Sequence, residues 1–342
     1  MNHEMTPMER TLTALRHDEP DRVPTFLNLT MHGAKIQGIP IKKYFSDPDA
    51  IVKGQLALGK KFGNDCYNAF TYSAAEAETF GAETIFYEDG PPNAGRPVIG
   101  SFSDIDSLEV PEIDNTRSMM VTIEATKKLK KEVGEDVPII GVVISPFSLP
   151  IMQMGFENYL ELMYSDPARL RALMKVNREF EVDYANRQIE AGATVIMYLD
   201  PVSSPTILPR EKFVETGFGV AQKSISSIKA PVIIHFASGR FLPIVDKVIE
   251  MGVIGVGVSN EEDLGAVKTA CGDKLALVGN LNGLQMPTWT EKDVEAQVKD
   301  AISKAAAGGG YVLSDNHGEI PYQVPEDVLG WITASCRKYG KY

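Results

Sequence analysis

The chain of 342 residues has only three cysteines, no long hydrophobic run and fewer basic than acidic residues. Cys66, Cys271 and Cys336 lie far apart with no CxxC spacing, which argues against a disulfide framework and against a cysteine-only zinc site. The longest apolar runs, residues 137–145 and 231–235, have the length of a strand and are too short for a membrane span. The first twenty residues lack the apolar stretch of a secretory signal, so we expect a cytoplasmic protein with no membrane partner.

Acidic residues outnumber basic ones by 46 to 34, which gives a formal charge of −12 and a pI near 5.0. A surface that binds nucleic acid needs clustered lysine and arginine along the phosphate backbone, so we expect no nucleic-acid partner. The hydrophobic content of 44% is that of an ordinary globular chain, and the length suits one large α/β barrel.

Short apolar runs alternate along the chain with amphipathic segments. The expected strands are eight runs: residues 22–29, 66–72, 137–145, 194–200, 231–238, 253–259, 275–282 and 311–316. Most are apolar on both faces, as strands of a helix-covered parallel sheet are. The expected helices between them are residues 116–133, 167–191, 210–228, 242–251, 261–270, 290–307 and 325–338. No run is followed by a GxGxxG turn, so the pattern predicts a (β/α)8 TIM barrel rather than a doubly wound sheet.

Two segments lie outside this alternation. Residues 6–17 are expected to form a helix that plugs or flanks the lower end of the barrel. Residues 73–111 hold glycine, proline and short strand-like pieces, which indicates an insertion after the second strand, folded as a hairpin over the mouth. No linker or low-complexity segment divides the chain, so residues 1–342 are expected to form a single domain.

Polar residues follow nearly every predicted strand, at the end where barrel enzymes carry their active sites. Asp200, His235 and His317 are the strongest catalytic candidates. The alternative for His235 is a buried imidazole bonded to a neighbouring strand. Asp315 and His317 are two residues apart and point the same way on an extended segment. With Asp200 and Glu76 or Glu78, they can form a carboxylate–imidazole cluster that holds zinc or moves protons.

Further candidates come from the same strand ends. Tyr72, the last residue of the second run, is a catalytic candidate, and Glu76, Ser145 and Asn280 are candidates for contact with substrate. Ser145 also fits the simpler role of a helix cap. Met154 belongs to a Met/Phe patch after the third strand, which either packs in the core or lines an apolar pocket.

Motifs along nearly the whole chain resemble those of the uroporphyrinogen decarboxylase superfamily. They are Thr6–Leu15, Pro20–Pro24, Phe62–Asp65, Glu76–Gly81, Ser145–Leu149, Asp200–Pro205, Val278–Asn280 and the pair His317-Gly318. The match looks closer to the methylcobamide:coenzyme M methyltransferases and related corrinoid-dependent methyltransferases. This resemblance implies a (β/α)8 barrel with substrate chemistry at its mouth.

Two departures from the family patterns bear on the activity. The decarboxylases carry an arginine-rich segment after the first strand, whereas Leu29–Lys35 has no arginine, and their Phe-Ser-Asp motif is replaced by Phe70–Tyr72. A porphyrinogen with many carboxylates needs cationic partners, so decarboxylation is disfavoured. The coenzyme M methyltransferases use His-x-Cys and a later Cys for zinc; here His235 remains, but Ala237 and His317 stand at the cysteine positions.

The resemblance therefore implies a methyltransferase that moves a methyl group between a small molecule and the cobalt of a separate corrinoid protein. His235 and His317 are expected as zinc ligands or general acids, with Asp315 as a further ligand if zinc is bound. The cofactor is methylcobalamin or a related corrinoid on the partner protein, and a homodimer fits the family. Two alternatives stay open: a uroporphyrinogen decarboxylase, and a non-catalytic protein that binds a tetrapyrrole or corrinoid.

Overall fold

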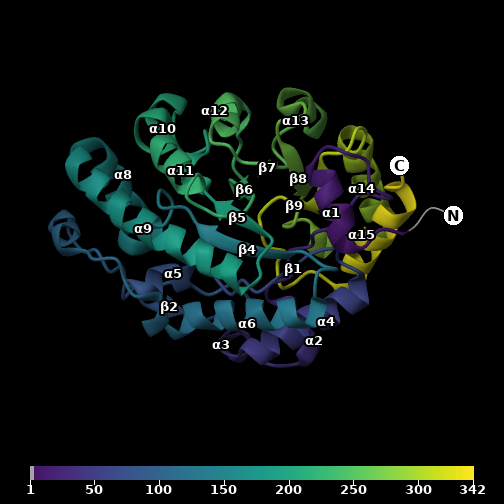
Figure 1. Ribbon diagram of the computed structural model, residues 1–342, viewed down its shortest axis with the longest axis horizontal. Helices are drawn as coiled ribbons and strands as arrows, with labels where there is room; N and C mark the ends of the chain where they lie inside the picture. The colour runs from purple at the N-terminus through teal and green to yellow at the C-terminus, as the bar shows by residue number, and fades with distance from the viewer. Residues whose placement is uncertain (1–3) are drawn as a thin grey trace.

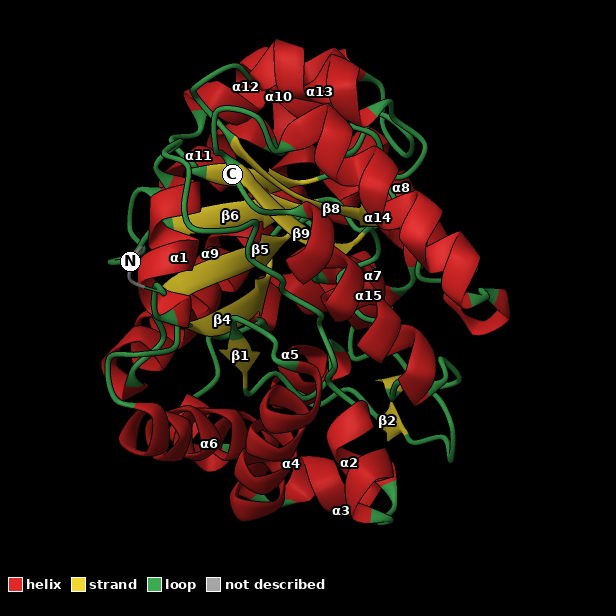
Figure 2. Ribbon diagram, turned by 90° about the vertical axis from the view of Figure 1, so that its right-hand side faces the viewer, coloured by secondary structure: helices red, strands yellow, loops and turns green. Residues whose placement is uncertain are grey.

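The computed structural model describes residues 4–342 and has at its centre a sheet of parallel strands adjacent in chain order. The seven strands are β1 (Tyr67–Asn68), β4 (Ile139–Ile144), β5 (Val195–Leu199), β6 (Val232–His235), β7 (Gly255–Gly257), β8 (Ala276–Leu281) and β9 (Tyr311–Asp315). The sheet is curled, and Figures 1 and 2 show helices packed around its outside. This is the α/β barrel architecture that the alternating pattern predicts.

Helices precede, separate and follow the strands. They are α1 (Pro7–Leu15), α2 (His32–Gln37), α3 (Ile41–Ser46), α4 (Pro48–Phe62), α5 (Ala74–Thr79), α6 (Arg117–Val133), α7 (Pro150–Met154), α8 (Phe156–Ser165), α9 (Pro167–Ala191), α10 (Arg210–Thr216), α11 (Phe218–Ile225), α12 (Val245–Glu250), α13 (Leu264–Cys271), α14 (Glu291–Ala305) and α15 (Glu326–Tyr339). Short 3-10 turns are Phe102–Ser107, Ile113–Asn115, Pro201–Ser203, Leu242–Ile244 and Met286–Thr288. Among the described residues, no helix is both long and apolar enough to cross a membrane.

The predicted helices agree with the structure where capping and periodicity coincide. Helix α9 has the predicted bounds, and α14 begins after a capping box between Thr290 and Asp293. The predicted helix 210–228 is instead two helices that meet at Gly217, where a β-carbon would lie 2.9 Å from the Phe147 ring. The helix predicted at residues 261–270 begins later than expected, at Leu264. The Asp263 side chain caps its first turn by accepting from the Ala266 amide (2.9 Å).

The first predicted strand, residues 22–29, is not a regular strand, which corrects the sequence prediction. Its one bridge to the sheet pairs Thr25 with Leu313 of β9 in parallel. On the other side, toward β1, one backbone bond runs from the Asp65 amide to the Thr25 carbonyl (2.9 Å). Side chains accept from the strand amides there: the Thr25 amide donates to Asp65 and the Leu27 amide donates to Asn64, both at 2.8 Å. Pro24 has no amide hydrogen, which also prevents a continuous ladder here. The barrel therefore closes through an irregular seam.

The predicted N-terminal helix lies at the lower end of the barrel, where the strands begin. The amide of Gly310, just before β9, donates to the Ala14 carbonyl (2.9 Å), and the Met8 amide donates to the Asp136 carbonyl, just before β4 (2.9 Å). Leu15 belongs to the apolar cluster inside the barrel, together with Phe26 and side chains of β4–β6. Helix α1 therefore closes this end, as the sequence predicts.

The predicted insertion contains the expected antiparallel hairpin, β2 (Thr84–Ile85) with β3 (Asn93–Ala94). It packs beside loops at the carboxyl ends of the strands. The Ile99 amide donates to the Gln153 carbonyl (2.9 Å), and the Gln323 side chain donates to the Asp89 carbonyl (2.6 Å). The segment thus borders the mouth and contributes Ser73 to its lining.

Candidate functional site

A cavity of about 280 Å³ lies at the carboxyl ends of the strands, the position expected for a barrel active site. Its walls come from segments after β1, β4, β5, β6 and β9 and are mostly apolar. The lining residues are Phe70, Ser73, Ile144, Ser148, Ile151, Met152, Leu199, Pro201, Ala237, His317, Gly318 and Glu319. We call this space the mouth cavity.

His235 ends β6 and lies behind the wall of the mouth cavity, 1% exposed. Its ring packs against Gly257 of the next strand, where a β-carbon would lie 2.0 Å from His235 Cδ2. The Ala237 amide donates to Nδ1 (3.0 Å), which places the proton of the neutral ring on Nε2. Burial, with a smaller effect of His317, lowers the pKa to about 4, so the imidazole is neutral at pH 7.

His317 lies in the turn after β9 and lines the mouth cavity. Its Nδ1 contacts the Ser238 hydroxyl, while its Nε2 is buried and has no hydrogen-bond partner among the described residues. Burial lowers its pKa, which favours the neutral ring. His317 therefore brings to the lining of the mouth cavity an imidazole whose Nε2 is without a hydrogen-bond partner among the described residues.

Asp315 orients the turn that carries His317. Its Oδ2 accepts from the amides of His317 (2.8 Å) and Gly318 (2.9 Å), while Oδ1 is buried without a partner among the described residues. Burial raises its pKa to about 6, which leaves it ionised at neutral pH. The carboxylate therefore fixes the backbone of the turn by hydrogen bonds.

Glu319 is a carboxyl group in the mouth cavity that the sequence analysis missed. The Thr30 hydroxyl donates to its Oε1. Burial, together with the nearby charge of Asp315, raises its pKa to about 8, so it holds a proton at neutral pH. The sequence signal was available: Glu319 is two residues beyond His317 in the same short turn.

Asp200 does not join the predicted cluster with the histidines; it lies with Ser145 in a buried hydrogen-bond network. The hydroxyls of Ser145 (2.6 Å) and Ser148 (2.7 Å) donate to Oδ1 of Asp200, and the Ser203 hydroxyl donates to Oδ2 (2.6 Å). Burial raises the pKa of Asp200 and these hydroxyls oppose that rise. Asp200 is 0% exposed and does not line the mouth cavity. It holds in place the side chain of Ser148, which does line the cavity.

Glu76 is buried behind β4, where its carboxyl group accepts a hydrogen bond from an amide of that strand. Its Oε1 accepts from the Ile144 amide (2.9 Å), and its Oε2 has no partner among the described residues. Burial, with a smaller effect of Glu181, raises its pKa well above the ordinary range. This contact supports the end of β4 and keeps Glu76 out of the cavity lining.

Tyr72 also lies apart from the histidines. Its hydroxyl donates to Glu78 (2.9 Å), and its ring packs against Phe45 and Phe86. Burial is the main cause of a raised pKa, so the phenol keeps its proton. These contacts give Tyr72 a packing role beside the inserted segment.

Asn280 and Met154 lie outside the mouth cavity lining. Asn280 donates to the Ser259 carbonyl (3.2 Å) and lines a separate polar cleft of about 330 Å³. Met154 is 1% exposed and packs in an apolar cluster with Phe147. Met152, from the same turn, lines the mouth cavity instead.

The donor set does not fit the zinc site that we considered. Among residues 4–342, no three histidine, cysteine, aspartate or glutamate side chains converge to hold a metal ion. His235 and His317 each use Nδ1 in a local contact, and Asp315 uses Oδ2 for two backbone amides. Structural and catalytic zinc sites need three or four protein ligands, so the described residues do not fit a zinc site.

The pattern of the uroporphyrinogen decarboxylase (URO-D) family matches residues 6–339. The chain belongs to this family. Among curated URO-D relatives, the uroporphyrinogen decarboxylase of Chromohalobacter salexigens is 24% identical over 73% of this chain and 72% of its own length. The methylcobamide:CoM methyltransferase MtaA of Methanosarcina barkeri is 27% identical over 69% of each chain.

A solved structure shares the fold over nearly the full length. A methyltransferase from Methanosarcina mazei superimposes with a TM-score of 0.88 at 24% identity, covering 98% of this chain and 99% of its own. A B12-independent methionine synthase from Shewanella has a TM-score of 0.59 at 13% identity, over 85% and 86%. The first likeness confirms the barrel, and the chain is an enzyme of the URO-D superfamily.

Proposed function

We propose that this URO-D family member is a methyltransferase that moves a methyl group between a small molecule and the corrinoid of a partner protein. The observation that carries the proposal is the chemistry of the mouth cavity: apolar walls, a neutral histidine and a carboxyl that holds its proton. Relatives that include a methylcobamide:CoM methyltransferase support it.

The same cavity disfavours the decarboxylase reaction. None of the described residues that line it is arginine or lysine. A porphyrinogen rich in carboxylates would lose its hydration here without gaining ion pairs, which costs several kcal/mol per charge, by order of magnitude. The volume of about 280 Å³ is near the lower end of small-molecule sites, roughly 300–1,000 Å³. An uncharged molecule of modest size suits this space.

In the proposed reaction, the corrinoid supplies the cobalt that takes or gives the methyl group. Glu319 would supply the proton. When the bond between the methyl carbon and a heteroatom breaks, the electron pair stays on the heteroatom, and the Glu319 proton neutralises it. In the reverse direction Glu319 takes a proton from the acceptor. His317 Nε2 is the second polar group in position to orient the molecule.

The test uses the full-length protein with methylcobalamin and, in separate reactions, a thiol, an alcohol and an amine as acceptors, followed by visible absorbance. We expect loss of the methyl–cobalt spectrum with one acceptor, and a slower reaction with Glu319→Gln. Glu88→Gln is the matched control, because Glu88 is exposed on the hairpin segment. Conversion of uroporphyrinogen to coproporphyrinogen by the wild type would establish the decarboxylase instead. Absence of a spectral change with every acceptor would leave only a binding role.

A further inference from the structure

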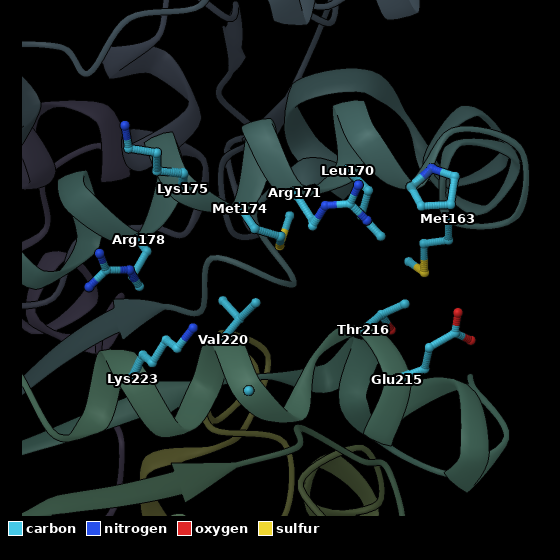
Figure 3. Close-up of a pocket in the computed structure, with 12 residues that line it drawn as sticks. Met163, Leu170, Arg171, Met174, Lys175, Arg178, Glu215, Thr216, Val220 and Lys223 are labelled. Carbon is cyan, nitrogen blue, oxygen red and sulfur yellow. The ribbon is translucent and has the colours of Figure 1, made fainter.

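A groove of about 440 Å³ runs along the outside of the barrel between α9 and α11. Figure 3 shows side chains of α9 above it and of α11 below it. Its floor is apolar and is formed by Met163, Leu170, Met174 and Val220. Gly219 on α11 leaves the lower wall open, because a β-carbon there would meet no atom within 4 Å. We call this feature the α9–α11 groove.

Four cations border the α9–α11 groove on a chain whose net charge is −12. The one carboxylate in its lining, Glu215, is paired with Lys212 (3.1 Å). Arg171, Lys175 and Arg178 lie on α9 at positions i, i+4 and i+7, and Lys223 lies opposite on α11. Within residues 4–342, none of the four has a carboxylate within ion-pair distance. In contrast, Arg169 and Arg187 of the same helix are both paired. Like charges spaced in this way repel one another on a helix, so an anionic occupant would relieve the repulsion.

The arrangement fits a helix better than a small anion. Leu170 and Met174 are one helical turn apart, and the cations of α9 extend over about 10 Å, at about 1.5 Å per residue. A third helix laid along α9 and α11 would bury apolar residues at its own i, i+4 and i+7 positions on the floor. Acidic residues beside that stripe would face the four cations. The solvent-facing apolar side chains of the groove are Pro167 and the half-buried Val220, because Met163, Leu170 and Met174 are at most 4% exposed.

We propose that the α9–α11 groove is a docking site for an acidic amphipathic helix of another protein. Pro167, Val220 and the aliphatic parts of the cationic side chains give the helix its apolar contact, and the charges select its acidic face. This proposal does not depend on the reaction in the mouth cavity. It assigns a function to four cations that form no ion pair within residues 4–342, although Arg178 also acts electrostatically on the buried carboxyl of Glu181.

The probe is a fluorescein-labelled peptide of about 18 residues, helical by design, with leucines at i, i+4 and i+7 and glutamates on both sides of them. Fluorescence anisotropy measures its binding to the full-length protein at about 50 mM salt. We expect saturable binding that weakens at least about tenfold in the double variant Arg171→Glu/Lys175→Glu. Gly219→Leu should weaken it comparably by filling the groove, without adding or removing a charge. The matched control is Lys127→Glu/Lys131→Glu on α6, which reverses an exposed, unpaired i, i+4 pair elsewhere.

Several results would overturn the proposal. Equal binding of a peptide with lysines in place of the glutamates would show that the groove cations do not select the ligand. An equal loss in the α6 control variant would show a general charge effect. Tighter binding to vesicles of phosphatidylserine, with the same dependence on Arg171 and Lys175, would assign the surface to anionic lipid. Absence of saturable binding to the acidic peptide would also refute it. Thermal unfolding of Gly219→Leu distinguishes a blocked groove from a failure to fold.

Discussion

Replacing Glu319 by glutamine tests whether the reaction uses the proton of the Glu319 carboxyl group. Glutamine has nearly the same size and its oxygen can still accept the Thr30 hydroxyl, but it has no carboxyl proton to give. A positioned general acid contributes a factor of about 10²–10⁴ in rate. We therefore expect Glu319→Gln to lower the rate of methyl transfer by that factor, or about 3–5 kcal/mol of transition-state stabilisation.

The pH dependence makes this prediction sharper. Burial raises the pKa of Glu319 to about 8, so its acid form predominates below pH 8 and is lost above it. When methyl transfer requires that acid form, the wild-type rate is flat toward neutral pH. It falls about tenfold per pH unit at alkaline pH, to about a tenth near pH 9. Glu319→Gln should be slow and show no such fall. The direction that needs this proton is transfer from a methylated thiol, ether or amine to cob(I)alamin. Initial rates of methylcobalamin formation in that direction, followed by absorbance from about pH 6 to pH 10, give both profiles.

A substitution at the neighbouring Asp315 tests the pKa of Glu319 a second way. Its negative charge adds to the effect of burial in raising the pKa of Glu319. Asp315→Asn removes that charge while its side-chain oxygen can still accept the amides of His317 and Gly318. The alkaline fall should therefore move to lower pH, by less than the full distance to the ordinary glutamate pKa, because burial remains. An unmoved fall, or a fall that persists in Glu319→Gln, would refute the assignment of the proton to Glu319.

Two further substitutions test how the structure supports the site. Asp65→Asn should lower the free energy of unfolding by about 3–5 kcal/mol in denaturant titrations, because buried Asp65 pairs with Arg10 (2.8 Å) and Arg22 (2.7 Å); a loss below about 1 kcal/mol would contradict this reasoning. Gly257→Ala should cost about 1–3 kcal/mol, because its new methyl group would overlap the His235 ring. In the His235→Ala background, Gly257→Ala should cost much less, because the ring that it overlaps is gone. Equal costs of Gly257→Ala in both backgrounds would show that contact with the His235 ring is not the cause.

The barrel was predictable where the period of the sequence and its capping residues agree. Helix α9 shows this best: Asp166 caps it, Pro167 occupies its first position and Gly192 ends it. No helix was predicted between residues 31 and 65, although α2, α3 and α4 lie there. The first two are only six residues long, too short for their periodicity to be distinguished from a loop.

The barrel seam was not predictable from local pattern, because it depends on contacts between distant residues. Residues 22–29 look like a strand, yet their amides on the β1 side bond to the side chains of Asn64 and Asp65, about forty residues away. Propensity describes the extended backbone of this segment correctly. It cannot show that the hydrogen-bond partner is a side chain rather than a strand.

The site was predicted in part, for a similar reason. Position at a strand end correctly brought His317 to the mouth cavity and His235 to its wall. It could not separate Asp200, whose charge is satisfied by three serine hydroxyls, from Glu319, which faces the cavity. Burial and hydrogen bonding decide that difference, and both depend on the tertiary structure.

The electrostatics of the molecule separate two kinds of recognition. In the mouth cavity, burial holds His317 neutral and keeps Glu319 protonated, so an uncharged molecule meets uncharged polar groups. A carboxylate bound there would meet no cation, and a bound ammonium group would favour ionised Glu319 and so remove the proton that the reaction needs. Exposed charge can instead select a macromolecular partner, because surface ions keep their hydration until they are paired. The α9–α11 groove concentrates unpaired cations on an otherwise acidic chain, so high salt should weaken peptide binding there while leaving the alkaline fall in methyl transfer unchanged.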